Sequence, residues 1–457
     1  MSDRFMIAAP ASGSGKTTVT CALLAALVSL GKDTVAFKCG PDYIDPMFHK
    51  KVTGVDSRNL DIFLMGEAGV RYSVAHRSAG KDIAVFEGVM GLYDGLGSST
   101  YSSSNHVSVL TDTPVLLVLS PKGMAASVCA TVKGFRSLED NRIRGVLLNN
   151  VNETQFRFYK QMIEERAGTK VIGYMPHVPE AQIESRHLGL VTADEIAGIR
   201  EKIEALGQQA LRSIDFDALF ALAAQAGPFD YNRDFLPSAA QEGDVKVYVA
   251  SDEAFSFWYE DNHDLLKSLG AEIAFFSPLH DEELPGDADG LILWGGYPEL
   301  HGTALANNTG MRDSLRRAIK AGLPVYAECG GFLYLHESLT DMQGGPHEML
   351  GILPARAHMT PKLQNLGYYE LKALRDNALS KKGERINAHF FHYSTSDFVG
   401  DCFKAVKQNG KTITCIASEA NLLAGYQHLH FWGNPRFAGN FLQTCSEYRV
   451  SRKGGTT

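Results

Sequence analysis

A glycine-rich segment near the N-terminus, residues 9–18, constrains the fold of this chain more than any other feature. It reads Ala-Pro-Ala-Ser-Gly-Ser-Gly-Lys-Thr-Thr, follows an apolar run at residues 5–8 and precedes a run rich in alanine, leucine and valine at residues 19–30. A strand, a glycine-rich turn and a Lys-Thr pair that opens a helix are the context of a P-loop. The backbone N–H groups of such a turn and the positive end of the helix dipole together hold phosphates. The alternative, a glycine-rich turn with only a packing role, is less consistent with this context.

The segment therefore predicts a site for a nucleoside triphosphate. We expect Lys16 to reach the β- and γ-phosphates and the Thr17 hydroxyl to bind Mg²⁺. A consensus P-loop has glycine six positions before the lysine, where this chain has Pro10, so Ser12 and Gly13 must supply the flexibility of the loop. The predicted nucleotide-binding residues are Ser12, Gly13, Ser14, Gly15, Lys16, Thr17 and Thr18.

Length and composition exclude several classes of protein. With 457 residues the chain exceeds one ordinary hydrophobic core, so two domains are expected. A net charge of -8 argues against a nucleic-acid groove, which usually carries a basic excess. The seven cysteines are scattered without a Cys-x-x-Cys pair, a pattern typical of reduced thiols rather than of disulfides or zinc sites. With no apparent signal peptide and no apolar run of about 20 residues, we expect a cytoplasmic protein without a membrane span.

Short apolar strands alternate with helical stretches along the first half of the chain, which predicts a parallel sheet covered on both faces. Ligands of such sheets lie at the carboxyl ends of the strands. The P-loop, a loop with two aspartates at residues 39–46, and Glu87 all follow strand ends, so we expect them to converge. The expected strands are residues 5–8, 34–38, 82–87, 114–119 and 145–149, with a helix at residues 124–135.

A second alternation follows a polar stretch without periodicity. Residues 201–226 are expected to be helical, and residues 227–244 are interpreted as a linker. The expected strands beyond it are residues 245–250, 271–276, 290–294 and 324–327, with a helix at residues 309–320. The predicted domains are thus residues 1–226 and 245–457, both α/β.

Residues 324–333 predict a nucleophile elbow with Cys329 at a sharp turn between a strand and a helix. Glycines after the cysteine permit such a turn, as in the Gly-x-Ser-x-Gly elbow. The helix N-terminus would favour the thiolate and supply N–H groups to an oxyanion. Gly295 and Gly296, after another strand, and Gly330 are the candidate oxyanion and glutamine-binding residues.

A strand near the C-terminus, residues 425–431, carries the candidate partner of Cys329. His428 and His430 are two positions apart, so alternation in a strand places both on one face. A lone cysteine is more often buried and inert, and paired histidines can belong to a core or bind metal. Taken together in one α/β unit, however, these residues favour a Cys–His acyl-transfer site with Cys329 and His428 as catalytic residues.

At these motifs the chain resembles the cobyrinic acid a,c-diamide synthases, glutamine-dependent enzymes of cobalamin biosynthesis, over nearly its whole length. Pro10 is this family's own P-loop variant. The resemblance implies a first domain similar to dethiobiotin synthetase and a second similar to class I glutamine amidotransferases. The motifs that carry it are residues 9–18, 40–46, 87–95 and 186–190 in the first domain, and residues 295–299, 328–331 and 426–431 in the second.

Two departures from the related amidotransferases concern the acid that orients the catalytic histidine. These enzymes usually carry Gly-His-Glu-Phe-His-Tyr-Ser before the final strands, whereas residues 388–394 here have Phe390 in place of the glutamate. Class I enzymes also place glutamate two positions after the histidine, where this chain has His430. The orienting group of His428 is therefore not identified, and our hypothesis is that His430 helps to fix its ring.

The resemblance also implies a mechanism and its ligands. ATP, as co-substrate with Mg²⁺, phosphorylates a carboxylate of cobyrinate, and ammonia released from L-glutamine through a thioester on Cys329 displaces the phosphate. Glu87 is the candidate second Mg²⁺ ligand beside Thr17, or alternatively a structural carboxylate. An alternative role for Asp42 and Asp45 is structural, in which each carboxylate only caps a turn. The residues implied to position the acetate side chains are Asp42, Tyr43, Ile44, Asp45 and Asp94.

Three other functions are compatible with parts of this sequence. The same chemistry on hydrogenobyrinate or nickel sirohydrochlorin would use the same motifs. A P-loop ATPase switch with an inactive second domain is disfavoured because Cys329 and His428 are both present. A cysteine peptidase of amidotransferase-like fold would leave the P-loop unexplained.

Overall fold

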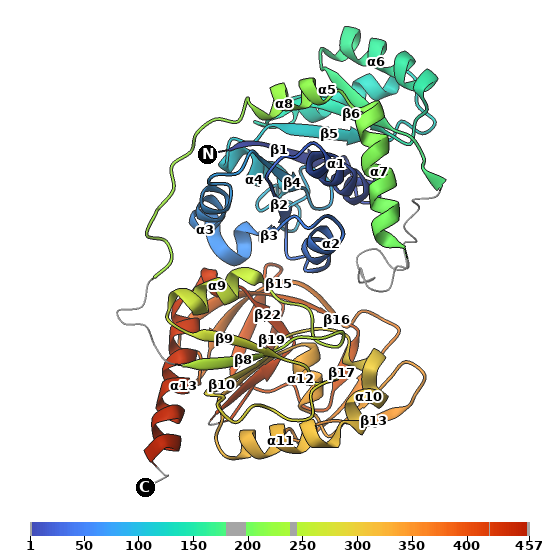
Figure 1. The fold of residues 1–457 in the computed structure, drawn as a ribbon. Helices are drawn as coiled ribbons and strands as arrows, with labels where there is room; N and C mark the ends of the chain where they lie inside the picture. Colours follow the sequence, from blue (N-terminus) through green and yellow to red (C-terminus); the bar gives the residue numbers. More distant parts are fainter. Residues whose placement is uncertain (1, 180–197, 238–244, 420, 455–457) are drawn as a thin grey trace. The chain divides into compact units, whose positions relative to one another are not determined.

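The computed structural model describes residues 2–179, 198–237, 245–419 and 421–454 (Figure 1). The chain divides into two compact units, Met1–Ile62 with Gly66–Arg233, and Phe63–Met65 with Asp234–Thr457. The motif at residues 186–190 and the linker residues 238–244 lie outside the described residues. Both units contain the parallel α/β sheet that the sequence predicts.

The described part of the first unit forms a seven-stranded sheet in the order β3-β2-β4-β1-β5-β6-β7. All neighbouring strands are parallel, and the expected strands are confirmed. The continuous burial of β4 and β5 reflects a sheet covered on both faces. The strands are β1 (Asp3–Ala8), β2 (Thr34–Cys39), β3 (Ser57–Leu60), β4 (Ile83–Glu87), β5 (Val115–Leu119), β6 (Ile143–Asn149) and β7 (Val171–Met175).

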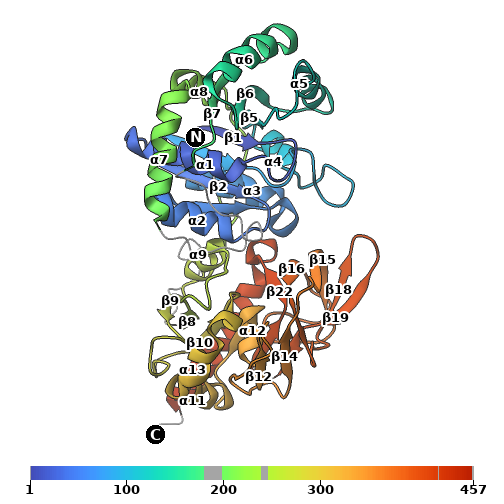
Figure 2. The same cartoon turned by 90° about the vertical axis from the view of Figure 1, so that its right-hand side faces the viewer.

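The helices of the first unit pack around this sheet, and Figures 1 and 2 show α7 beside α1. The two helices approach closely at Gly207, where a Cβ atom would lie 2.8 Å from the Cβ of Ala25. The single helix expected at residues 201–226 is instead two helices, because Asp215 leaves the helix and caps α8 by accepting from the N–H of Ala218. The helices are α1 (Lys16–Ser29), α2 (Ile44–Thr53), α3 (Ile62–Arg77), α4 (Ser104–Leu110), α5 (Ser127–Ser137), α6 (Glu153–Ala167), α7 (Ile199–Ser213) and α8 (Phe216–Ala223).

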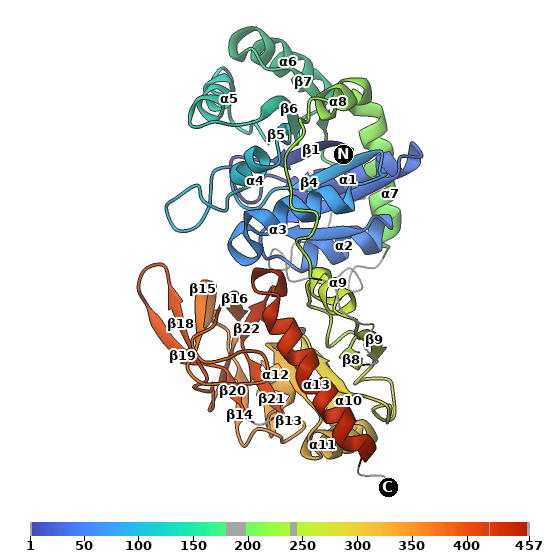
Figure 3. The same ribbon diagram turned by 90° about the vertical axis from the view of Figure 1, so that its left-hand side faces the viewer.

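The second unit is built on a six-stranded sheet in the order β20-β21-β11-β10-β8-β9. Only β20 (Ala417–Ser418) runs antiparallel to its neighbour. Figure 3 views this unit from the side on which α13 lies, and Gly290 of β10 leaves room there for Cys445 and Phe441 of α13. The other strands are β8 (Lys246–Ala250), β9 (Glu272–Phe276), β10 (Gly290–Leu293), β11 (Val325–Glu328) and β21 (Leu422–Gly425), and the helices are α9 (Glu260–Ser268), α10 (Gly302–Asn307), α11 (Thr309–Lys320), α12 (Gly330–Tyr334) and α13 (Arg436–Gly454).

Two further sheets complete the described part of the second unit, and the sequence analysis did not predict them. One has the order β13-β12-β14-β17, and the other, which is antiparallel throughout, has the order β19-β18-β15-β16-β22. Their strands are β12 (Ser338–Thr340), β13 (Pro346–Glu348), β14 (Arg356–Met359), β15 (Asn365–Ala373), β16 (Arg385–His392), β17 (Ser394–Ser396), β18 (Phe403–Lys407), β19 (Thr412–Cys415) and β22 (Gln427–Leu429).

The single strand expected at residues 425–431 is not observed. The chain leaves the parallel sheet at Gly425, the end of β21, and joins the antiparallel sheet as β22. It then enters a 3₁₀ turn, η4 (Phe431–Gly433). Among the helices that the structure describes, none combines the length and apolar character needed to cross a membrane.

Candidate active sites

The P-loop joins β1 to α1 and has the conformation that its sequence predicts. Gly13 and Gly15 have φ angles of +75° and +87°, a region that favours glycine. A side chain at Gly15 would also collide with the amide of Asn149, which ends β6 and donates to the Ser14 carbonyl at 3.0 Å. The glycine at the helix start is therefore required by both conformation and space.

Lys16 is buried and lies over the loop that precedes it. Its Nζ donates to the carbonyl oxygens of Met90 at 2.5 Å and Ala11 at 3.2 Å. Burial, followed by the nearby charge of Lys38, lowers the pKa of Lys16 to about 8. The lysine predicted to bind phosphates thus donates to carbonyl oxygens, and burial and Lys38 outweigh the favourable charges of Glu87, Asp45 and Asp94.

Glu87 is the centre of a buried polar cluster at the end of β4. Its Oε1 accepts from Thr17 Oγ1 at 2.5 Å and from Lys38 Nζ at 2.8 Å, and its Oε2 lies 2.9 Å from His49 Nε2. Burial opposes the charge of Glu87, but Lys38 and His49 outweigh it and hold its pKa well below its usual value. These partners favour the ionised form of Glu87, which also contacts Thr17, the residue predicted to bind Mg²⁺ beside it.

Lys38, near the end of β2, links Glu87 to Asp45 in the first turn of α2. Its Nζ forms ion pairs with both Glu87 and Asp45. Burial lowers the pKa of Lys38, but Asp45 and Glu87 more than reverse this and raise it well above its usual value. Lys38 and His49 were not predicted from the sequence, although Lys38 stands at the end of an expected strand, where ligands of such sheets lie.

The residues predicted to position the acetate side chains lie beside this cluster, in the short turn before α2, in its first helical turn, and in the loop after β4. The loop expected at residues 39–46 therefore ends at Tyr43, and Ile44 and Asp45 begin the helix. Asp42 Oδ1 accepts from the N–H groups of Ile44 at 2.8 Å and Asp45 at 3.3 Å, which is the capping geometry of the alternative interpretation. Asp94 Oδ2 accepts from the N–H of Gly91 at 2.8 Å. The structure thus brings the P-loop, the aspartate loop and Glu87 together, as expected from their places at strand ends.

The oxygen donors of this cluster fit Mg²⁺. The Thr17 hydroxyl and the Glu87 carboxylate are hard oxygen ligands, and Mg²⁺ usually takes one or two such groups with phosphates and water. Within the described parts of the chain, no group of three or more His, Cys, Asp or Glu side chains could hold a metal ion. A magnesium ion held by Thr17 and Glu87 would take its remaining ligands from phosphate oxygens and water.

Cys329 stands between β11 and α12 with φ +43° and ψ −102°, a strained conformation for a residue with a side chain. A Cβ atom at Gly331 would collide with the Leu293 carbonyl, and one at Gly330 would lie 2.7 Å from the N atom of Gly296. The elbow therefore needs both glycines. This geometry confirms the expected sharp turn and places the Gly296 backbone beside it.

His428 lies on β22 opposite His389 of β16 and is 2% exposed. Its Nδ1 is 3.3 Å from Oε2 of Glu328, the residue before Cys329. Burial disfavours the charged imidazole, but hydrogen bonds to Cys329 and Glu328 outweigh this and raise the pKa of His428 to about 9. A Cβ atom at Gly295 would lie 3.0 Å from Cε1 of His428, so Cys329, His428 and the predicted glycines form one site.

The expectation that His430 shares the face of His428 is wrong. Because β22 ends at Leu429, the alternation does not reach His430, whose Nε2 lies 3.7 Å from Oδ2 of Asp261. Its ring is 4.9 Å from that of Tyr259. Phe390 is buried against Tyr369, with ring centroids 4.9 Å apart, so an aromatic contact occupies the position where related enzymes carry glutamate.

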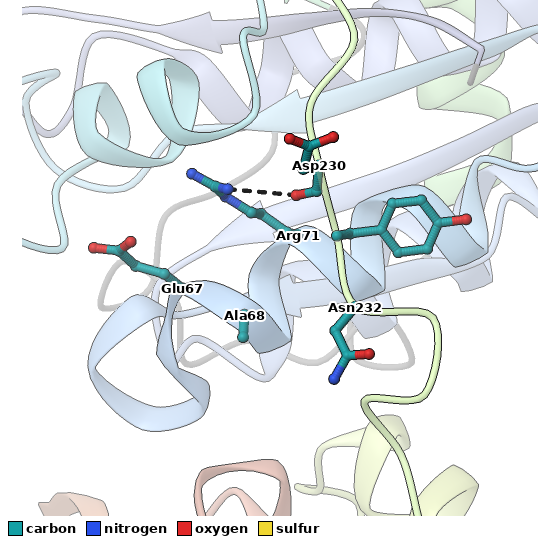
Figure 4. A pocket seen from close by; sticks show the side chains of 6 residues that line it. Glu67, Ala68, Arg71, Asp230 and Asn232 are labelled. Carbon is teal, nitrogen blue, oxygen red and sulfur yellow. Dashed lines mark hydrogen bonds between the residues drawn. The ribbon is translucent and has the colours of Figure 1, made fainter.

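A further pocket in the first unit belongs to neither site. Figure 4 shows it between α3 and the chain segment at residues 230–232, with Arg71 Nη1 donating to the carbonyl of Asp230 at 3.4 Å. None of the predicted site residues lines it. The lining residues are Glu67, Ala68, Arg71, Asp230, Tyr231 and Asn232.

Comparison with known proteins identifies relatives of both units. Residues 5–191 match the family model of the CobQ/CobB/MinD/ParA nucleotide binding domain, and residues 246–436 match that of the CobB/CobQ-like glutamine amidotransferase domain. A cobyrinate a,c-diamide synthase from Clostridium tetani is 41% identical over 446 residues, 96% of this chain and 99% of that relative. Proteins of the same name from Caldanaerobacter subterraneus and Thermoplasma volcanium are each 37% identical to this chain. The first match covers 97% of this chain and 98% of that relative, and the second covers 98% of this chain and 99% of that relative.

Proposed function

The chain belongs to the cobyrinate a,c-diamide synthase family, and from this premise we propose that it uses ATP and L-glutamine to amidate the a and c acetate carboxylates of cobyrinate. The observation that carries this proposal is the presence, in one chain, of a P-loop beside a buried carboxylate and of a Cys329–His428 elbow. The first can activate a carboxylate, and the second can release ammonia.

Amidation of a carboxylate by ammonia is unfavourable in water unless the carboxylate is activated. An acetate oxygen of cobyrinate attacks the γ-phosphorus of ATP, ADP leaves, and an acyl phosphate forms. Lys16 would exchange its carbonyl partners for phosphate oxygens and stabilise the charge on the transferred group. When bound by Thr17 and Glu87, Mg²⁺ supplies further neutralisation of phosphate charge. Ammonia then attacks the acyl carbon, and inorganic phosphate leaves.

The start of α2 and the loop after β4, which both carry aspartates, are proposed to position the acetate and the ammonia. Asp42, Tyr43, Ile44 and Asp45 surround the start of α2, and Asp94 lies on the loop that contacts the P-loop through the Leu92 N–H and the Ala9 carbonyl, 2.8 Å apart. A carboxylate such as Asp94 can bind ammonium or take its proton before attack. Asp45 already forms an ion pair with Lys38 through its Oδ2.

In the second unit, the Cys329 thiolate attacks the side-chain amide of glutamine. The proton held by the Cys329–His428 pair passes to the leaving ammonia, and a thioester with Cys329 remains. The proposed donors to the tetrahedral oxyanion are the backbone N–H groups of Gly296 and Gly330. Gly295, which lies beside His428, is proposed to line the same glutamine site. Water then hydrolyses the thioester to glutamate and restores the thiol.

The direct test is an amidation assay with ATP, Mg²⁺ and glutamine on a panel of tetrapyrrole acids. We expect the diamide of cobyrinate, formed only with ATP. Faster amidation of hydrogenobyrinate or nickel sirohydrochlorin would transfer the proposal to that substrate, and ATP hydrolysis without amidation of any of the three would contradict it.

A further inference from the structure

Glu328, the last residue of β11, contacts the catalytic histidine from a position directly before the nucleophile. It is 1% exposed, and its Oε2 lies 3.3 Å from Nδ1 of His428. Its Oε1 accepts from the N–H of Leu429 at 2.9 Å and from the Tyr326 hydroxyl at 2.5 Å. Oε1 therefore contacts the backbone of β22 and the Tyr326 hydroxyl, whereas Oε2 contacts the imidazole.

We propose that Glu328 is the positioning residue of the Cys329–His428 pair and takes the place of the acid that class I amidotransferases carry after the histidine. By accepting from Nδ1, the carboxylate keeps a proton on that nitrogen and leaves Nε2 as the nitrogen that exchanges a proton with Cys329. The inference rests on the proposed glutaminase function of this site and adds the residue that orients its base.

The local structure explains how an acid before the nucleophile can serve this role. The strained turn at Cys329, with φ +43°, redirects the chain immediately after Glu328, so both side chains can approach one imidazole. The N–H of Leu429, the residue after His428, also donates to Glu328, so one carboxylate fixes both the ring and its strand. The alternative orienting positions carry other contacts, since His430 lies by Asp261 and Phe390 by Tyr369.

A purely structural role for Glu328 would need only the hydrogen bonds of Oε1, whereas a positioning role needs the contact of Oε2 with His428. The Glu328→Gln variant separates these two roles. The carbonyl oxygen of glutamine can keep the bonds to Leu429 and Tyr326, but its NH₂ group then faces Nδ1 of His428. A donor at that place disfavours the imidazolium and moves the proton of the neutral ring to Nε2, where it blocks proton acceptance from Cys329. A structural role predicts little change, and a positioning role predicts a large one.

The experiment compares Glu328→Gln with wild type and with Tyr326→Phe, a matched variant that removes a donor to Oε1 and leaves Oε2 untouched. We expect Glu328→Gln to lower the glutaminase rate by roughly 10²- to 10⁴-fold and to keep amidation driven by ammonium salts. Tyr326→Phe should lose far less. Absence of amidation by wild type with either nitrogen source would contradict the proposed function, whereas glutaminase of Glu328→Gln near the wild-type rate would overturn the inference alone.

Two further measurements separate positioning from stability. Iodoacetamide labelling of Cys329 against pH should show a midpoint about one to two pH units higher in Glu328→Gln than in wild type, and an unchanged midpoint would overturn the proposal. If Glu328→Gln does not fold, ¹⁵N-histidine spectra of wild type decide, with His428→Gln used for assignment. We expect a proton on Nδ1 of His428 both below and above its titration, and a neutral ring protonated on Nε2 would overturn the role of Glu328.

Discussion

At the scale of single residues, Lys16 combines a buried position with an unusual pKa. Burial and the charge of Lys38 lower its pKa to about 8, whereas a bound phosphate favours its charged form. Above about pH 8, nucleotide binding should therefore take up a proton and weaken as pH rises, approaching tenfold per pH unit. Calorimetry in buffers of different ionisation enthalpy at about pH 7 and about pH 9.5 measures both effects.

The Lys16→Met variant is the control for that titration, since it should bind nucleotide weakly and with much less pH dependence. Equal affinity of the unaltered protein at the two pH values, without proton uptake, would show that Lys16 does not meet the phosphates.

Lys38 should contribute strongly to stability because it is the cation between two buried carboxylates. Its side chain is 6% exposed, and those of Asp45 and Glu87 are 13% and 0% exposed. Lys38→Met should lower the free energy of unfolding by about 3–5 kcal/mol, the usual cost of leaving a buried charge without its partner. The surface pair Lys81–Asp33 is the matched control, and Lys81→Met should cost less than about 1 kcal/mol. Similar denaturation midpoints for the two variants would contradict this account of the cluster.

At the scale of secondary-structure elements, the contact between α1 and α7 depends on a glycine. A Cβ atom at Gly207 would lie 2.8 Å from that of Ala25, whereas one at Gly134 in α5 would meet nothing within 4 Å. Gly207→Ala should therefore destabilise the protein, with an overpacking cost of about 1–3 kcal/mol that exceeds the gain in helix propensity. Gly134→Ala should stabilise it by about 0.5–1 kcal/mol. Chemical denaturation measures both changes, and a stabilising Gly207→Ala would show that the helices do not approach this closely.

The elements that the sequence predicts well are those whose patterns are local. The strands of the parallel sheets, the P-loop, the Cys329 elbow and α11 follow from apolar runs and glycine positions within about ten residues. The break between α7 and α8 is also local, and its signal was the N-cap residue Asp215 before a new apolar run.

The contacts that the sequence analysis missed join residues far apart in the chain. Lys38, His49 and Glu87 meet only because β2, α2 and β4 are neighbours in space. The end of β22 at Leu429 set His430 apart from His428, and no periodicity could show it. Glu328 had a usable signal, since it is a charged residue at the end of a buried strand beside a nucleophile.

At the scale of the whole molecule, the account assigns carboxylate activation and glutamine hydrolysis to different units. Glu87→Gln removes a charge that contacts Thr17 and Lys38 in the first unit. It should abolish ATP-dependent amidation while basal glutaminase activity, which uses Cys329 and His428, survives. Parallel assays of glutamate release and diamide formation test this, and equal loss of both activities in a folded variant would argue against separate sites.

The measurement that tests the central claim most directly follows nitrogen from glutamine into the product. With L-glutamine labelled by ¹⁵N at the side-chain amide, cobyrinate should gain label at both the a and c amides, and only when ATP is present. Cys329→Ser should give no labelled product, yet it should form unlabelled diamide when ammonium salts are added. Labelled amide formed by Cys329→Ser at the wild-type rate, or no label in the cobyrinate product of the unaltered enzyme, would contradict the account.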